Sequence, residues 1–170
     1  NKLKSKETIN YGYNRNLSKP IAPKEVPYSL YVLALANKAD LSLMNYYKSN
    51  SALLSIDGKY LLAAAYVLAG DKEKGKSILP NSFSGEESIR QFGGSFYSPV
   101  RDEAIALNAL IELDPNHKEI GVMAKHVSEY LKNKSNYLNT QDRIFGFLAL
   151  GKLAKLANAT SVEGTVKADG

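Results

Sequence analysis

The sequence predicts an all-α protein built from tandem helical hairpins. Apolar segments alternate with Asp, Ser and Gly residues of the kind that begin and end helices. The longer apolar helices are expected to start near residues 28, 59, 99 and 140, at spacings of 31, 40 and 41 residues that are typical of a repeated helix pair. We therefore expect about seven helices between residues 27 and 158.

Each expected helix has a start signal in the sequence. Pro27 suits the first turn of a helix over residues 28–38, and Asp40 can cap a second helix that reaches residue 48. The Asp57-Gly58 pair opens a third helix, which ends at Gly70. The later starts are Asp71 for a short fourth helix, Ser98-Pro99 for a fifth at residues 100–113, an Asn116 and Glu119 capping box for a sixth, and Thr140 for a seventh.

The two members of each pair differ in polarity. The first helix is apolar nearly all round, whereas the sixth is amphipathic, with Ile120, Met123 and Val127 on one face. A helix that is apolar on every side must be covered on every side, which favours an α/α toroid over an open solenoid. Four inner helices are too few to close such a ring, so we predict a partial toroid whose remainder lies upstream. Its apolar flanks, at residues 28–36 and 144–156, should self-associate or be covered by the N-terminal segment.

The two ends of the chain differ from the helical part. Residues 1–26 read as an extended basic arm, because residues 1–24 hold six of the 22 Lys and Arg residues and one of the 17 Asp and Glu residues. The rest of the chain is neutral, so the net charge of +5 indicates a solvated linker or docking arm and no nucleic-acid site. Residues 159–170 predict a linker or a strand that leads into a following β-domain.

Composition excludes several classes of protein. With 44% hydrophobic and 23% charged residues, the chain is an ordinary globular protein. Its longest apolar run, residues 61–69, is short of the roughly 20 residues that span a bilayer, so no membrane span is expected. The sequence contains no cysteine, which excludes disulfides, thiolate metal sites and a thioester within these residues.

Candidate catalytic groups lack the spacing that chemistry requires. His117 and His126 are nine residues apart and would face opposite sides of a helix. Asp102 and Glu103 suit the first turn of a helix electrostatically, but no nucleophile or base accompanies them at a defined spacing. We therefore interpret the segment at Arg101 as a structural cap that orders the loop before it. The sequence predicts no catalytic, cofactor-binding or metal-binding residue, and hence no enzyme.

Three stretches resemble one known family. They are YSLYVLALANKAD at residues 28–40, YSPVRDEAIALNALIELDP at residues 97–115, and NTQDRIFGFLALGKLAK at residues 139–155 followed by SVEGTVKADG. Their order resembles the C-terminal part of the thioester-type, complement-like α/α toroid domain of bacterial alpha-2-macroglobulin-like proteins. The match covers about three quarters of the chain, and the third stretch carries it most specifically.

The resemblance implies a non-enzymatic domain of a protease inhibitor that traps its target. The implied partners are proteases, through a larger parent protein, and the other domains of that protein. The implied location is the periplasm or cell surface, with the parent anchored in the membrane. The family's Cys-x-Glu-Gln thioester motif is absent here, so no thioester residue can be carried over. The resemblance places Tyr97, Ser98, Arg101 and Asp102 toward the active face, as a candidate interaction loop.

Other functions remain open at this stage. The stretch LLAAAYVLAGDKEKGKSIL at residues 61–79 looks like a tetratricopeptide repeat, which favours a helical-repeat interaction module. The other pairs depart from a strict 34-residue period. A toroid-type enzyme is disfavoured because the sequence holds no acidic cluster or metal triad. A purely structural repeat is the fourth alternative.

Overall fold

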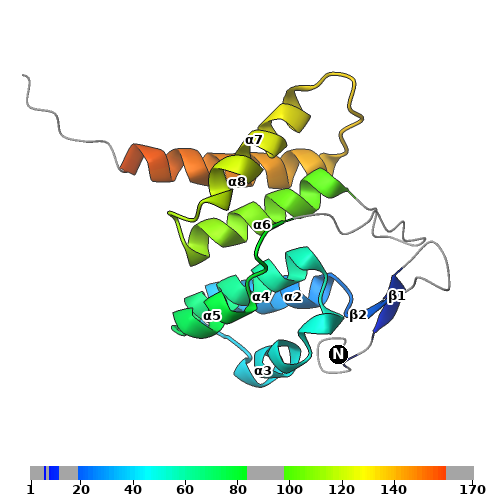
Figure 1. The fold of residues 1–170 in the computed structure, drawn as a ribbon, viewed down its shortest axis with the longest axis vertical. Helices are drawn as coiled ribbons and strands as arrows, with labels where there is room; N and C mark the ends of the chain where they lie inside the picture. Colours follow the sequence, from blue (N-terminus) through cyan, green and yellow to red (C-terminus); the bar gives the residue numbers. More distant parts are fainter. Residues whose placement is uncertain (1–5, 7, 12–18, 84–97, 160–170) are drawn as a thin grey trace, which may run out of the picture.

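The described residues form an all-α fold, as the sequence predicts, apart from one short pair of strands near the N-terminus. A computed structural model describes residues 6, 8–11, 19–83 and 98–159. Seven α-helices lie in these ranges. A 3-10 turn, η2 (Ser51–Leu53), precedes the third of them. The helices (Figure 1) are α2 (Glu25–Leu35), α3 (Leu41–Ser49), α4 (Ile56–Leu68), α5 (Lys72–Ile78), α6 (Pro99–Leu113), α7 (Glu119–Lys132) and α8 (Thr140–Ala159).

The helices form an inner and an outer set. Helix α2 packs against α4, α4 against α6, and α6 against α8, so these four make a continuous inner layer (Figure 1). Helix α5 packs on α4, and α7 packs on both α6 and α8, while α3 touches α4 more lightly. The expected alternation of inner and outer helices is therefore present. The tail predicted beyond residue 159 lies outside the described residues.

The arm is not an extended linker throughout. Strands β1 (Ile9–Tyr11) and β2 (Lys19–Ile21) pair in antiparallel fashion, with Ile9 opposite Ile21. Ile21 and Ala22 are buried, and the Ala22 N–H donates to the carbonyl of Leu53 at 2.7 Å. The described end of the arm therefore packs beside η2, and the predicted solvated arm is wrong for this part.

Cap residues set most helix starts as expected. The side chains of Asp40, Asp71 and Ser98 each accept a hydrogen bond from a backbone N–H in the first turn of the following helix. Three predicted starts are wrong, and one of them is that of α2, which begins at Glu25 and not at residue 28. Ser55 caps α4, its Oγ accepting from the Gly58 N–H at 3.3 Å, so the helix begins before the Asp57-Gly58 pair. The Asn116 and Glu119 capping box does not form, because α7 begins at Glu119 with no side-chain cap.

Burial explains the difference in polarity between helices. Seven consecutive residues of α4, from Tyr60 to Tyr66, are at most 2% exposed. This helix has α2, α6 and α5 on its sides, so no face of it meets water. Helix α7 buries one stripe, formed by Ile120, Met123, Ala124 and Val127. The amphipathic pattern of an outer helix and the apolar pattern of an inner one are therefore both explained by the number of neighbours.

The inner helices at the two ends of the layer leave apolar faces uncovered. On α2, Tyr28, Val32 and Leu35 are 39%, 44% and 47% exposed, and they follow one stripe of the helix. On α8, Ile144, Phe147 and Leu148 are 50%, 65% and 57% exposed. The predicted apolar flanks are confirmed. We call these two sets the α2 stripe and the α8 stripe.

Close packing of the outer helices depends on glycine. A Cβ placed on Gly75 of α5 would stand 2.7 Å from the carbonyl oxygen of Ala63 and 3.0 Å from Cγ2 of Val67, both on α4. A Cβ on Gly146 of α8 would meet Cδ1 of Leu131 on α7 at 2.7 Å. The backbone oxygen of Ala63 cannot move aside as a side chain can, so Gly75 fixes the spacing of the α4–α5 hairpin.

Replacing Gly75 should therefore destabilise the fold. We expect Gly75→Ala to lower the free energy of unfolding by about 1–3 kcal/mol, because overpacking outweighs the better helix propensity of alanine. Gly151→Ala is the matched control, since Gly151 also lies inside a helix but has no atom within 4 Å of its added Cβ. That control should gain about 0.5–1 kcal/mol. Urea denaturation followed by circular dichroism measures both, and equal stability of the two variants would contradict the argument.

Candidate functional site

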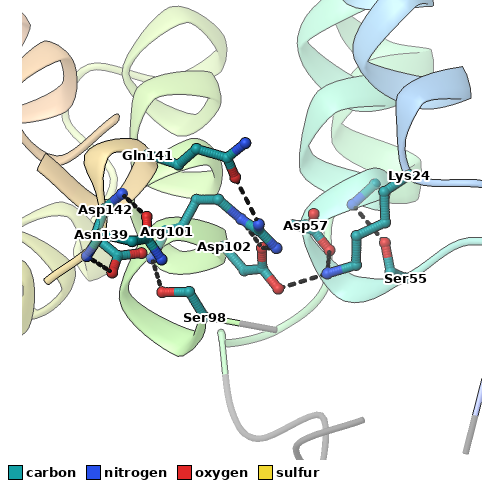
Figure 2. A network of polar contacts seen from close by, with 10 residues as sticks. Lys24, Ser55, Asp57, Ser98, Arg101, Asp102, Asn139, Gln141 and Asp142 are labelled. Carbon is teal, nitrogen blue, oxygen red and sulfur yellow. Dashed lines mark hydrogen bonds and ion pairs between the residues drawn. The ribbon is translucent and has the colours of Figure 1, made fainter. Parts of the chain in front are cut away.

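A polar pocket lies where the N-terminal ends of the four inner helices meet. Its volume is about 260 Å³. Each inner helix supplies residues from its first turns or from the position just before it, and apolar side chains complete the wall. The lining residues are Lys24, Glu25, Tyr28, Asp57, Leu61, Arg101, Asp102, Ile105, Gln141 and Phe145. Figure 2 shows the polar members of this group close together.

Lys24 is at the centre of the polar contacts. Its Nζ lies 2.5 Å from Oδ2 of Asp102 and 3.3 Å from Oδ1 of Asp57 (Figure 2). The two carboxylates come from the first turns of α6 and α4, and their side chains are 7% and 4% exposed. Lys24 itself precedes α2 directly, and its side chain is 13% exposed. One largely buried ammonium group therefore joins the starts of three helices.

Arg101 extends the network to the fourth inner helix. Its Nε donates to Oδ1 of Asp102 at 3.0 Å, and its Nη1 donates to Oε1 of Gln141, on α8, at 2.9 Å. The guanidinium is nearly buried, with 7% of the side chain exposed. The starts of α2, α4, α6 and α8 are thus linked through one continuous set of polar contacts.

The charged neighbours of Asp102 shift its pKa in opposite directions. Burial raises the pKa of Asp102, and the nearby Asp57 carboxylate raises it further, while Lys24 and Arg101 lower it. The raised pKa means that the two cations do not fully offset the cost of burying this carboxylate. The first turn of a helix adds a favourable dipole at both aspartates.

The residues proposed for an interaction loop occupy the interior. Ser98 is 5% exposed and caps α6, its Oγ accepting from the Arg101 N–H at 3.2 Å. Arg101 and Asp102 are 6% and 5% exposed. Tyr97 lies outside the described residues. The structural cap expected at this position is therefore present, and its side chains join the buried network.

Sequence reasoning missed three members of the site. Lys24 was assigned to a solvated arm and Asp57 to a helix start, and Gln141 entered only as part of the stretch at residues 139–155. A signal was present for the carboxylates, because Ser55 and Ser98 each cap a helix that carries an aspartate in its first turn. Nothing in the sequence indicates that one lysine reaches both aspartates, since 78 residues separate Lys24 from Asp102.

The two histidines lie apart from this site. His117 accepts a hydrogen bond at Nδ1 from the Glu119 N–H, at 3.3 Å. The side chain of His126 is 57% exposed, and its Nδ1 lies 3.1 Å from Oε1 of Glu103. Burial raises the pKa of Glu103, and the contact with His126 lowers it. Among the residues that the structure describes, no three His, Cys, Asp or Glu side chains gather as metal ligands would.

The two aspartates of the pocket differ in their hydrogen bonds. Asp102 accepts from both Lys24 and Arg101, so its oxygens are engaged in linking helices. Asp57 differs, because its Oδ1 is buried without a hydrogen bond of good geometry.

Comparisons with family models, with curated proteins and with solved structures find no match to this chain. No described helix is long and apolar enough to cross a membrane.

Removing the central cation should destabilise the fold strongly. We expect Lys24→Met to lower the free energy of unfolding by about 3–5 kcal/mol at neutral pH, because Arg101 alone then faces two buried carboxylates. Lys76→Met is the matched control, since Lys76 pairs with Glu73 at 49% and 85% exposure. That change should cost less than about 1 kcal/mol. Chemical denaturation measures both.

The effect of Lys24→Met should depend on pH. A protonated carboxyl needs no counter-cation, so the loss should shrink as the pH falls. The pKa of Asp102 is raised, so its titration stabilises the fold below the ordinary value of 3.8, and this contribution is lost as the pH rises through the raised pKa. A variant that loses the same free energy at acidic and at alkaline pH would show that Lys24 acts through packing alone.

Proposed function

We propose that this chain is a non-enzymatic domain of a bacterial macroglobulin-like protease trap, in which it packs against other helices or domains of a larger protein. The α2 and α8 stripes carry this proposal. Inner helices α4 and α6 are covered on all sides, whereas the two end helices expose large apolar side chains. Exposed apolar residues that gather on one face mark an interaction surface.

The exposed stripes have the chemistry of an inner-helix contact. Val32 and Leu35 on α2, and Ile144 and Leu148 on α8, are aliphatic residues at helical spacing. The same kinds of side chain fill the core on α4 and α6, where Leu62, Leu107 and Leu110 are fully buried. A further apolar helix beside α2 or α8 would therefore extend the layer with the packing that it already has.

The polar network supports a scaffolding role. General acid–base catalysis requires a group that can reach a substrate. Asp102 is 5% exposed and holds two cations, so its contacts favour fixing the helix ends over turnover. A rigid set of helix ends suits a domain that transmits or resists a rearrangement of the larger protein.

The partners and the location in this proposal come from the family resemblance. The partners are proteases, reached through the larger protein, and the location is the periplasm or the cell surface, with the larger protein anchored in the membrane. The stretches at residues 28–40, 97–115 and 139–155 carry this resemblance. They supply α2, α6 and α8, three of the four inner helices.

A helical-repeat interaction module is the second candidate. The α4–α5 hairpin favours it, because Gly75 brings the two helices into contact at the position where a small residue is required. A repeat module would bind its partner through one continuous face. The trap is preferred because six of the nine exposed large apolar side chains lie on the two end helices of the inner layer.

The exposed stripes should drive association of the isolated chain. We expect concentration-dependent self-association in light scattering, and loss of it in the double variant Val32→Glu with Phe147→Glu. Both side chains are well exposed, so stability should change by less than about 0.5 kcal/mol per site. Val122→Glu is the matched control, because Val122 is 47% exposed on outer helix α7. A wild-type chain that stays monomeric at every concentration would contradict the proposal.

Trapping is tested with the larger protein that contains this chain. The protein is mixed with an endoprotease, and cleavage of a large protein substrate is compared with cleavage of a short peptide. A cage excludes large substrates by size, so we expect the first activity to fall and the second to remain. Loss of both activities, or of neither, would argue against a trap and in favour of the repeat module.

A further inference from the structure

The four inner helices share one register, which the residues of the polar pocket define. Each helix supplies a pair of lining residues four positions apart, and the first of each pair lies in the first turn or just before it. The pairs are Lys24 and Tyr28, Asp57 and Leu61, Arg101 and Ile105, and Gln141 and Phe145. Residues four apart lie on one face of a helix, so the four pairs occupy equivalent positions.

One side of α8 is exposed where the other inner helices are covered. The α8 stripe, formed by Ile144, Phe147 and Leu148, lies three, six and seven positions beyond Gln141. The equivalent residues are Pro27, Leu30 and Tyr31 on α2, Tyr60, Ala63 and Ala64 on α4, and Ala104, Leu107 and Asn108 on α6. All of these are buried or partly buried. Within the described residues, α8 therefore lacks a neighbour on a side that is covered on α2, α4 and α6.

The other side is exposed on α2 alone. The α2 stripe, formed by Tyr28, Val32 and Leu35, lies four, eight and eleven positions beyond Lys24. The equivalent residues are Leu61, Ala65 and Leu68 on α4, Ile105, Ala109 and Glu112 on α6, and Phe145, Ala149 and Lys152 on α8. These too are buried or partly buried. In the described part of the chain, α2 thus lacks the neighbour that the other three inner helices have on this side.

Inside the chain, these two sides pack against each other. Pro27 lies on the side of α2 that corresponds to the α8 stripe, and a Cβ added to Gly58 would stand 3.1 Å from its Cγ. Gly58 precedes Leu61 by three positions, so it lies on the side of α4 that corresponds to the α2 stripe. Between α6 and α8, Nζ of Lys152 donates to the carbonyl oxygen of Asn108 at 3.3 Å, which joins the same two sides.

We propose that the α2 stripe of one copy of this chain packs against the α8 stripe of a second copy. The two stripes are the two halves of the contact that already joins the inner helices within the chain. The starts of all four inner helices meet at the pocket, so α2 of the second copy runs parallel to α8. A head-to-tail contact leaves one stripe open on each copy and can extend beyond a dimer. This inference rests on the proposed role of the stripes as interaction surfaces, and it adds their partner.

The test uses one variant for each stripe, Val32→Glu on α2 and Leu148→Glu on α8. These side chains are 44% and 57% exposed, so both variants should fold. A single helix pair makes a small interface, so association is followed by sedimentation equilibrium up to millimolar concentration. We expect the wild type to associate, and each variant alone to associate at least about ten-fold more weakly, because the contact would bury a charge. A one-to-one mixture of the variants should form a dimer and nothing larger, since one intact pair of stripes remains.

Two controls accompany the mixture. When the double variant Val32→Glu with Leu148→Glu replaces either partner, only monomers should remain. Val122→Glu, on outer helix α7, should associate as the wild type does. Circular dichroism checks the fold, and Leu35→Glu or Ile144→Glu, at 47% and 50% exposure, replaces a variant that does not fold.

The outcomes separate this contact from the proposed function. Wild-type association of either single variant indicates an α2-to-α2 or α8-to-α8 contact, which overturns the head-to-tail proposal and leaves the stripes as interaction surfaces. A mixture that stays monomeric also overturns it. A wild-type chain that stays monomeric removes both the contact and the role of the stripes, whereas trapping is decided by the protease assay with the larger protein.

Discussion

The contact of one lysine with two buried carboxylates determines how the inner helices meet. Lys24 lies between Asp57 and Asp102, and Arg101 continues the contacts to Gln141. Together these residues lie at the starts of all four inner helices or just before them, with Arg101 and Asp102 both on α6, so the ends of the layer are fixed relative to one another. Buried ion pairs contribute little net stability compared with apolar packing, but their geometry is demanding. The network therefore specifies the alignment of helices that apolar packing alone would allow to slide.

Apolar packing supplies the stability that the network does not. Helix α4 is buried from Tyr60 to Tyr66 because it has neighbours on every side. The same residue types on α2 and α8 remain exposed, since each of these helices has one inner neighbour and not two. The composition of a helix here reflects the number of helices that it is built to contact. The two stripes have the same residue types as the existing core, which fits the proposed packing against further helices.

Helix identity could be predicted from the sequence, and the site could not. Local rules located the caps at Asp40, Asp71 and Ser98, because a cap bonds within its own turn. They failed at Ser55, where the neighbouring Asp57-Gly58 pair gave the stronger signal. No capping rule that uses neighbouring residues predicts the role of Lys24. In the sequence, its charge looked like part of a basic arm. Its contacts require the starts of three helices to lie together, and only the packing of segments that are distant in the sequence brings them together.

The apolar stripes and the polar pocket are not independent surfaces. Tyr28 belongs to both, since it begins the exposed stripe of α2 and forms the pocket wall with Phe145. A helix that packs along Val32 and Leu35 would reach Tyr28 and limit the rotation of its ring. The wall of the pocket would then be held in place, and the pocket would lose part of its opening on that side. A partner helix on that flank would therefore contact a residue of the pocket wall, because Tyr28 is common to both surfaces.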